Sequence, residues 1–561
     1  MRLFKEVIKN NLKMIIFYVL IGIVINFLDL YIVTYYQKIL DAFQYQTLTI
    51  IPLVIYGMLL LISTILGYIE NYPEQQVKNK LYLDFKLQVL KKMTTIDYLE
   101  YQKIGTGRLS QKAEDGAVAS RDIMIDFWLK LVRQLLPTGI FSLIFIYKIK
   151  KEYVLFVFLG YILVVIISNL ILKKLYKLKE SILINQEFLN KHLIRSFMEL
   201  VVFRTNKKFD TEIKVTKEGI KNIVDSKTKI KLVHEIFFTV FALIVNVLKV
   251  VVLGYAVLKS DLSVGAVVTV ISLLGKAYEP IAIFNVEYVD YKLNKVTVYK
   301  YIELLEIKDD EALNSGTILK NIDGNIELKN ITYSYNNNKN IINDLSLKIS
   351  KNNKVALVGE SGSGKSTIIK LIIGLIKYNS GNILIDDKEL SKLNLNSFYD
   401  NVTYVSQEAP IFDGTIRENL IFDKNISDEE ILKILNLVCL DKFYEKLDKG
   451  LDTELGEKGI RMSGGERQRV ALARLFFDDS KIIVLDEATS SMDNITEKIV
   501  MRNIVERLEN KTIIIIAHRL ETIKDVDMIY VLSDGIIKEQ GKYKELINKN
   551  GYFAELYKSV K

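Results

Sequence analysis

"GESGSGKST", Gly359 to Thr367, is the stretch of this chain that says most about its fold. It follows the apolar run "KVALV" and precedes the apolar helical pattern "IIKLIIGLI". Glycines in such a loop let the backbone curl until successive N–H groups point at phosphate oxygens, and the lysine adds a point charge. A strand, this loop and a helix, in that order, predict a phosphate-binding loop in a nucleotide-binding α/β domain. A glycine turn without a ligand is the alternative.

Each residue of the loop is a candidate ligand of ATP. Lys365 is expected to reach the β- and γ-phosphates, and the Ser366 hydroxyl is expected to bind Mg²⁺. The full set of expected ATP-binding residues in the loop is Gly359, Glu360, Ser361, Gly362, Ser363, Gly364, Lys365, Ser366 and Thr367.

A second candidate region is "KIIVLDEATSSMD", which begins at Lys481. Its apolar residues predict a buried strand, and Asp486 at the strand end is expected to hold Mg²⁺ through water. Glu487 follows directly and is expected to polarise the attacking water as a general base. The alternative is a solvated acidic loop tip. His518, one of three histidines, follows "TIIIIA" and is expected to contact the γ-phosphate, unless it is a structural histidine.

The second half of the chain alternates short apolar runs with helical stretches from about residue 321. This alternation predicts a mostly parallel sheet with crossover helices. The predicted strands are 354–359, 382–386, 402–406, 481–486, 512–518 and 528–535. A charged segment without a strong apolar period lies ahead of them and predicts a linker. We therefore expect a membrane domain over 1–305, the linker over 306–320 and the α/β domain over 321–561.

The first half is far more apolar than a soluble domain. Half of the 561 residues are hydrophobic, and the mean hydropathy is +0.18. Three apolar runs that start at Met14, Ile50 and Val154 approach the ~20 residues that a membrane-spanning helix needs. Three weaker ones lie near 128–148, 235–257 and 264–284, so six spans are expected. Buried helices of a soluble core are the alternative for any one run.

Charge and cysteine content set further bounds. The segments 71–125 and 174–232 are rich in Lys and Arg, which predicts that they and both termini are cytoplasmic, although the basic loop 148–152 disagrees. The net charge is +9, but no basic aromatic face or recognition motif predicts a nucleic-acid partner, and anionic lipid head groups suffice. Cys439 is the only cysteine, so no disulfide can form within the chain. The Lys-, Ile- and Asn-rich composition points to a bacterial cytoplasmic membrane.

A third glycine-bearing stretch, "MSGGERQRVALARL" from Met462, places a serine and two glycines before a helical pattern. Free N–H groups at a helix start favour a negative partner, and the helix dipole adds to this preference. The stretch therefore predicts a second anion site.

Together and in this order, the motifs resemble those of ABC transporters, and the whole chain resembles an exporter-type half-transporter. "ITYSY" resembles the adenine-stacking loop, with Tyr335 as the stacking ring. "YVSQEAPIFDGTIRENL" resembles the Q-loop, so Gln407 is expected to touch Mg²⁺ and the water. "TELGEKG" resembles the X-loop, "MSGGE" the signature motif, "SSMD" the D-loop and "AHR" the H-loop. Met462 and Glu466 depart from the commonest family residues, Leu and Gln, without an expected loss of activity.

The resemblance implies a division of roles. The catalytic residues would be Glu487, His518 and Gln407, and the metal ligands Ser366, Gln407 and Asp486. ATP bound to one subunit would be contacted across a dimer by Ser463, Gly464, Gly465, Glu466 and Asp493 of the other. A homodimer is favoured because both half-sites look intact, and a heterodimer with a degenerate partner is the alternative. The segments 106–115 and 194–204 resemble the regions of the two coupling helices.

The implied function is ATP-driven export of a lipophilic drug, a lipid or a peptide by alternating access. An importer with an exporter-like fold, for example for a metal chelator, is one alternative. A non-pumping membrane ATPase that regulates a partner is another. Asp29, Lys249, Lys276 and Glu279 fall within expected spans. They are expected to line a polar substrate cavity, or Asp29 and a lysine are expected to form a pair that switches during transport. The alternative is that the lysines snorkel to an interface.

Overall fold

The computed structural model describes residues 2–198, 200–259, 262–335, 339–422, 424–456, 459–517 and 519–560. The chain forms two compact units. Unit 1 comprises Met1–Thr94 and Lys103–Ile307, and unit 2 comprises Thr95–Gln102 and Lys308–Lys561.

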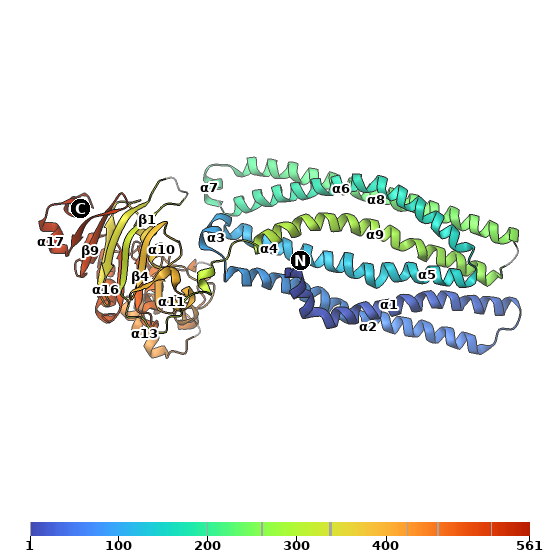
Figure 1. The fold of residues 1–561 in the computed structure, drawn as a ribbon, viewed down its shortest axis with the longest axis horizontal. Helices are drawn as coiled ribbons and strands as arrows, with labels where there is room; N and C mark the ends of the chain where they lie inside the picture. The colour runs from blue at the N-terminus through green and yellow to red at the C-terminus, as the bar shows by residue number, and fades with distance from the viewer. Residues whose placement is uncertain are drawn as a thin grey trace. The chain divides into compact units, whose positions relative to one another are not determined.

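Unit 1 consists of long helices that lie side by side (Figure 1). They are α1 (Arg2–Gln44), α2 (Ile50–Met93), α4 (Thr106–Asp122), α5 (Leu136–Ile149), α6 (Tyr153–Met198), α8 (Phe209–Lys259) and α9 (Val264–Leu305), with the short α7 (Leu200–Thr205) between α6 and α8. Helix α9 contacts both the α1–α2 pair and the α6–α8 pair, so it is the central element of the bundle. At about 1.5 Å per residue, a helix such as α8 is more than twice as long as the ~30 Å hydrocarbon core, and it must extend well beyond the membrane.

The apolar helices match most of the predicted spans. Among the described residues, five helical segments are long and apolar enough to cross a membrane: Phe4–Gln44, Ile50–Met93, Leu109–Ile149, Phe209–Lys259 and Val264–Leu305. A shorter apolar helix, Tyr153–Val164, lies where a further span was expected. A helical membrane domain is therefore confirmed, whereas the count of six spans stays a prediction.

The third apolar segment has an internal irregularity that the sequence did not reveal. Two π-helical stretches, η1 (Ile123–Leu129) and η2 (Leu131–Leu135), connect α4 to α5. Pro137 follows them and has no N–H for the carbonyl of Arg133. The side chain of Asn26 in α1 donates to that oxygen instead, at 3.2 Å. Wide helical turns of this kind are frequent at functional sites.

Unit 2 contains a six-stranded sheet in the order β10-β9-β3-β8-β7-β6. Its strands are β3 (Lys354–Gly359), β6 (Val402–Val405), β7 (Ile482–Asp486), β8 (Thr512–Ile516), β9 (Met528–Ser533) and β10 (Ile536–Gly541). All neighbours pair in parallel except β10, which pairs antiparallel with β9. The predicted parallel sheet is thus confirmed for five of the six predicted strands.

The remaining predicted strand was assigned to the wrong sheet. Residues 382–386 overlap β4 (Ser380–Ile385), which belongs to a separate antiparallel sheet in the order β2-β1-β4-β5. Its other strands are β1 (Ile326–Tyr333), β2 (Ile342–Ile349) and β5 (Lys388–Glu389). In β4 the buried Ile383 and Ile385 lie on either side of the half-buried Leu384, as expected for a sheet with one face in the core.

The core of unit 2 explains why the parallel strands read as unbroken apolar runs. Val355 and Leu357 of β3 pack in one hydrophobic cluster with the antiparallel sheet, while Ala356 and Val358 pack in a second cluster on the opposite face. Both faces of the sheet are therefore covered. The helices of unit 2 are α10 (Lys365–Ile372), α11 (Leu395–Tyr399), α12 (Ile416–Ile421), α13 (Asp428–Leu437), α14 (Asp441–Tyr444), α15 (Gly464–Ala473), α16 (Asn494–Arg507), α17 (Tyr543–Asn548) and α18 (Tyr552–Val560).

A piece of the N-terminal half belongs to unit 2. The backbone N–H of Asp97 donates to the carbonyl of Lys308 at 3.0 Å, and that of Asp310 donates to the carbonyl of Thr95 at 2.8 Å. Tyr98, at the start of α3 (Tyr98–Ile104), packs against the core of unit 2. Residues 95–102 therefore belong to unit 2, and they precede the 106–115 segment that the sequence singled out.

Candidate functional site

The predicted phosphate loop lies between β3 and α10. Gly359 ends the strand, residues 360–363 form the loop, and Lys365 to Thr367 form the first turn of α10. Gly364 is the N-cap of the helix with φ 102°, a left-handed conformation that a side chain would strain. No side chain in the described part of the chain caps this helix start. Its N–H groups are therefore left to a ligand or to water.

The polar groups of the loop fit a triphosphate. The ammonium group of Lys365 donates to the carbonyls of Gly359 and Glu360, both at 2.8 Å, so the lysine is held over the loop. The hydroxyl of Ser363 is buried and has no hydrogen-bond partner among the residues that the structure describes. Burial lowers the pKa of Lys365, while Glu487 and Asp486 oppose that shift. A buried cation and an unpaired buried hydroxyl are the donors that phosphate oxygens satisfy.

The predicted metal ligands Ser366 and Asp486 meet at the end of β7. The Ser366 hydroxyl donates to Oδ1 of Asp486 at 3.3 Å, and the Tyr404 hydroxyl donates to Oδ2 at 3.2 Å. Burial raises the pKa of Asp486, although both hydrogen bonds counter the shift. Hydroxyl and carboxylate oxygens suit Mg²⁺. No cluster of three or more His, Cys, Asp or Glu side chains occurs in the described part of the chain, so phosphate and water would have to complete the coordination sphere.

Tyr404 is a site residue that sequence reasoning missed. It lies on β6, which pairs with β7 so that Tyr404 is level with Val484. The available signal was its position three residues before Gln407, on the strand that leads into the Q-loop.

Glu487 follows β7 directly and has φ 53°, in the left-handed region. Its N–H donates to the carbonyl of Ile516, the last residue of β8, at 3.2 Å. Such a conformation costs a non-glycine residue about 1–3 kcal/mol and persists where the surroundings fix it, often at active sites. His518 lies outside the described residues. Glu487 is thus held beside Asp486, and its role as general base stays a prediction.

Two further predicted residues lie in exposed turns. Gln407 is exposed in the turn after β6. Tyr335 is 41% exposed, and its ring packs edge-on against Tyr333 with the centroids 5.0 Å apart. An exposed ring supported from one side is suited to stacking, as the prediction for Tyr335 requires.

The signature turn forms a capping box. Ser463 is the N-cap of α15: its hydroxyl accepts from the N–H of Glu466 at 3.3 Å, and its own N–H donates to Oε2 of Glu466 at 2.7 Å. Either Glu or Gln can complete this motif, which explains how Glu466 replaces the commoner Gln. Met462 is buried in the core cluster, where a flexible side chain fills the space of a Leu.

Packing explains the second glycine of the signature turn. A Cβ at Gly465 would lie 2.9 Å from the carbonyl oxygen of Ser491 in the D-loop. The first turn of α15 therefore presses directly on the D-loop backbone of the same chain.

Gln468, one turn further along α15, connects the signature helix to two other motifs. Its amide group donates to the carbonyl of Gln407 at 3.3 Å and to the Ser490 hydroxyl at 3.1 Å, and its Oε1 accepts from the Ser491 N–H at 2.9 Å. The side chain is 3% exposed. Sequence reasoning missed Gln468, because its polar position in a helical pattern resembles a solvated one.

The D-loop is fixed on its other side as well. Asp493 caps α16 by accepting from the N–H groups of Thr496 and Ile495, and these bonds hold its pKa below the usual range. Arg519 donates to the carbonyl of Met492 at 2.9 Å and pairs with Glu497 at 2.6 Å. The contact of Asp493 across a dimer stays a prediction.

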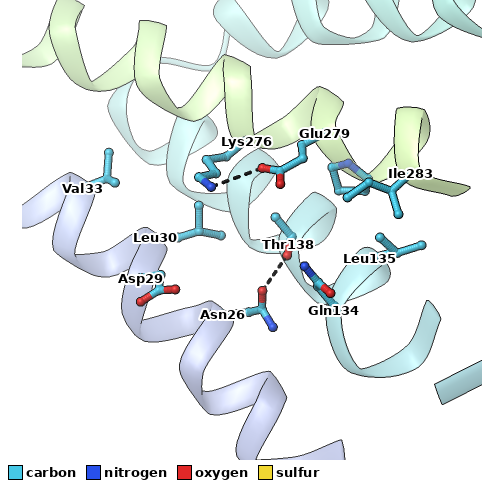
Figure 2. A pocket seen from close by; sticks show the side chains of 11 residues that line it. Asn26, Asp29, Leu30, Val33, Gln134, Leu135, Thr138, Lys276, Glu279 and Ile283 are labelled. Atoms are coloured by element: carbon cyan, nitrogen blue, oxygen red, sulfur yellow. Dashed lines mark hydrogen bonds and ion pairs between the residues drawn. The ribbon is translucent and has the colours of Figure 1, made fainter. Parts of the chain in front are cut away.

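Three of the four charged residues singled out in the expected spans lie together. Asp29, Lys276 and Glu279 line a cavity of about 120 Å³ within unit 1, and Figure 2 shows them approaching it from two helices. Lys249 does not line it.

Known proteins match these features. Residues 342–490 match the family model for ABC transporters. An uncharacterized ABC transporter ATP-binding protein of Bacillus subtilis is 32% identical over 62% of this chain and 59% of its own length. An ATP-dependent lipid A-core flippase of Photorhabdus laumondii is 38% identical over 47% of this chain and 45% of its own length. The chain thus spans only about half the length of these two relatives.

Other matches extend over nearly the whole chain. A putative export ATP-binding/permease protein of Rickettsia prowazekii is 28% identical over 90% of this chain and 88% of its own length. The structure of a bacterial Atm1-family ABC exporter with ATP bound superposes with a TM-score of 0.83 at 23% identity, covering 98% of both chains. Residues 342–490 are thus similar to the ABC transporter family, and the whole chain, with one domain of membrane-length helices and one α/β domain, shares the fold of a bacterial ABC exporter.

Proposed function

We propose that this chain is one half of an ATP-driven exporter in a cell membrane. It would cross the membrane six times with both termini in the cytoplasm, and the composition favours a bacterial membrane. The cargo class is a lipophilic drug, a lipid or a peptide. The full-length relatives, named as export or flippase proteins, support this direction of transport.

One observation carries the proposal: a phosphate-binding loop and a hydroxyl–carboxylate metal site adjoin in a chain that also folds a bundle of membrane-length helices. Lys365 and the unpaired Ser363 hydroxyl supply phosphate contacts, and Ser366 and Asp486 supply metal contacts. A soluble ATPase would not need the helices of unit 1, and a passive channel would not need this site.

The chain's own residues divide the hydrolytic work. Lys365 would neutralise charge on the transferred phosphoryl group, Ser366 and Asp486 would hold Mg²⁺, and Glu487 would take a proton from the attacking water. Bound Mg²⁺ would supply charge neutralisation at the β- and γ-oxygens. Gln407, whose carbonyl accepts a hydrogen bond from Gln468, would report on the site, and His518 would orient the water.

A second subunit completes the proposal. Ser463, Gly464, Gly465, Glu466 and Asp493 form an ordered surface that shares no hydrogen bond with residues 359–367 in the described part of the chain. This arrangement favours contact with ATP on a partner subunit. A homodimer is the simplest assembly, because this chain carries both halves of the composite site.

The decisive test is Glu487→Gln in the full chain, reconstituted in lipid nanodiscs. We expect ATP binding to persist and hydrolysis to fall on the order of 10²–10⁴-fold, because the amide cannot accept the proton. Glu506→Gln is the matched control, since Glu506 is exposed on α16 and pairs with Arg502 at its surface. Normal turnover in Glu487→Gln would contradict the assigned general base.

Direction of transport needs a separate assay. ATP-dependent accumulation of cargo in inside-out vesicles would support export. Accumulation only in right-side-out vesicles would indicate an importer. The absence of ATP-coupled flux over a broad panel, with hydrolysis intact, would indicate a regulatory ATPase.

A further inference from the structure

The polar cavity of unit 1 lies deep in the membrane region. The Gly265 N–H donates to Asp41 at 3.0 Å, which sets the end of α1 level with the start of α9. At 1.5 Å per residue, Asp29 is about 22 Å from the end of α1 and Lys276 about 18 Å from the start of α9. Both groups therefore lie inside a hydrocarbon core of about 30 Å that begins at this level.

Charges at this depth must border water or a polar ligand. The side chains of Lys276 and Glu279 are 53% and 46% exposed on unit 1, and lipid contact there would be costly. Asn26 and Thr138 also line the cavity and are bonded to each other at 2.8 Å (Figure 2). This face of the bundle is therefore suited to a translocation path and poorly suited to lipid.

The charges in the cavity do not balance. Lys276 pairs with Glu279 at 3.2 Å, which leaves Asp29 as the excess charge. Asp29 accepts a hydrogen bond from the Ser63 hydroxyl at 2.6 Å, and no basic side chain in the described part of the chain pairs with it. A carboxylate in this setting favours a cation that is brought by a ligand.

A larger apolar cavity adjoins the polar one. Its volume is about 540 Å³, within the range of small-molecule sites. Leu135 and Pro280 line both cavities, so the two share a wall. Tyr161, Phe284 and Tyr288 line the apolar chamber, and π-helix η2 ends at its edge.

We propose that these two cavities form one cargo site for an amphiphile with a cationic head group and an apolar body. The ammonium group would sit beside Asp29, with the amide of Asn26 and the hydroxyl of Thr138 nearby. The apolar body would fill the chamber between α5, α6 and α9. This inference rests on the proposed function and narrows its cargo from drugs, lipids and peptides in general.

The first experiment tests the head group. The full chain in nanodiscs of uncharged lipid is titrated with three amphiphiles of equal chain length: an alkyl trimethylammonium, an alkyl maltoside and an alkyl sulfate. We expect saturable stimulation of ATP hydrolysis by the ammonium compound at the lowest concentration. Asp29→Asn should raise its half-stimulating concentration by about tenfold. Glu235→Gln, an exposed carboxylate on α8 paired with Lys231, is the matched control.

The second experiment tests the apolar chamber. A Cβ at Gly139 would meet only the Tyr161 hydroxyl, at 4.0 Å, so Gly139→Leu can fill the chamber without a backbone clash. We expect it to abolish stimulation by a long-chain ammonium compound and to spare a short-chain one. Gly254→Leu, on α8 where nothing lies within 4 Å of the added Cβ, is the matched control.

The outcomes separate this inference from the proposed function. Equal potency of the three head groups, or unchanged potency in Asp29→Asn, would overturn the cationic site. An effect of Gly254→Leu equal to that of Gly139→Leu would overturn the apolar chamber. Either result, obtained while Glu487-dependent hydrolysis and flux of some other cargo persist, would leave the exporter assignment intact. If the wild-type chain showed no ATP-coupled flux of any cargo, the proposed function itself would be contradicted.

Discussion

Helices α10 and α15 both begin with glycines and a serine, yet their N-termini differ in kind. At α10, Gly364 provides the cap without a side chain, and the Ser363 hydroxyl beside it is buried without a partner. At α15, Ser463 and Glu466 bond each other in a closed capping box, and Gly465 is pressed against the D-loop. The first helix start is open to a ligand, and the second is already satisfied within its own chain.

The difference shows that glycines before a helix carry two separate meanings. At α10 they give the backbone conformations that leave N–H groups free. At α15 they allow close approach of another backbone, and helical geometry at Gly465 is ordinary. The first arrangement is a binding device, whereas the second places a surface at a fixed position relative to Gln407 and the D-loop.

The largest effect should follow from Lys365→Met. Removing the buried ammonium group takes away a charge that the phosphates need, so we expect both ATP binding and hydrolysis to fall, the latter on the order of 10²–10³-fold. Binding of a fluorescent ATP analogue and phosphate release measure the two separately. Lys351→Met, at an exposed lysine of unit 2, is the control. Retained affinity for the nucleotide would contradict the interpretation of the α10 helix start as the phosphate-binding site.

Ser463→Arg should dissociate binding from turnover. The arginine removes the N-cap and projects into the surface proposed to meet a partner's nucleotide, while the loop at 359–367 is untouched. We expect ATP affinity within about twofold of wild type, and hydrolysis reduced about a hundredfold, a loss of ~3 kcal/mol in transition-state stabilisation. A monomer that hydrolyses ATP would contradict the proposal that two subunits together form the site.

Sequence predicted the open site far better than the closed one. The order of strand, glycine loop and helix was enough to place Lys365, Ser366 and Asp486 together, because parallel strands end at a common edge. The capping box at Ser463 follows the familiar Ser-x-x-Glu spacing. The stretch predicts an anion site and resembles the signature motif, and neither interpretation includes the capping box. Hydrogen bonds of Gln468 depend on three segments far apart in sequence, so no local pattern could show them.

The same limit applies to the sheets and the membrane helices. Apolar periodicity identified β4 as a strand but could not choose its sheet, because its partner β1 lies more than fifty residues earlier. The spacing of apolar residues did not predict the π-helical turns before Leu136. Pro137 indicates where a backbone hydrogen bond of the helix is lost, but it does not indicate that the preceding turns are wide. The cavity that joins Asp29 to Lys276 required the packing of α1 on α9.

Gln468→Leu should produce an intermediate effect. The leucine has a similar volume but cannot bond the Gln407 carbonyl or the D-loop, so both motifs lose a shared anchor. We expect kcat for ATP hydrolysis to fall about tenfold with KM nearly unchanged, because the phosphate contacts remain. Gln468→Glu should recover part of the loss, since one carboxylate oxygen can still accept from the Ser491 N–H. A change confined to KM would assign Gln468 to nucleotide binding instead.

The smallest effects concern the thermal stability of the protein. Substitution should lower stability at the signature turn and raise it at the phosphate-loop site. Ser463→Ala removes a satisfied cap and should destabilise the full chain by about 1 kcal/mol.

Asp486→Asn removes a buried charge whose folded-state pKa is raised, and should stabilise the protein without Mg²⁺ by roughly 2–4 °C in a domain of this size. Because a raised pKa means that wild type loses stability as pH rises through it, the gain should grow from about pH 4 towards neutrality. Thermal unfolding in nanodiscs, with and without Mg²⁺ and nucleotide, measures both variants. Asp486→Asn could instead destabilise the protein at neutral pH without metal. The polar groups of the phosphate-loop site would then be as fully hydrogen-bonded without ligand as those of the signature turn, and the difference proposed between the two helix starts would be contradicted.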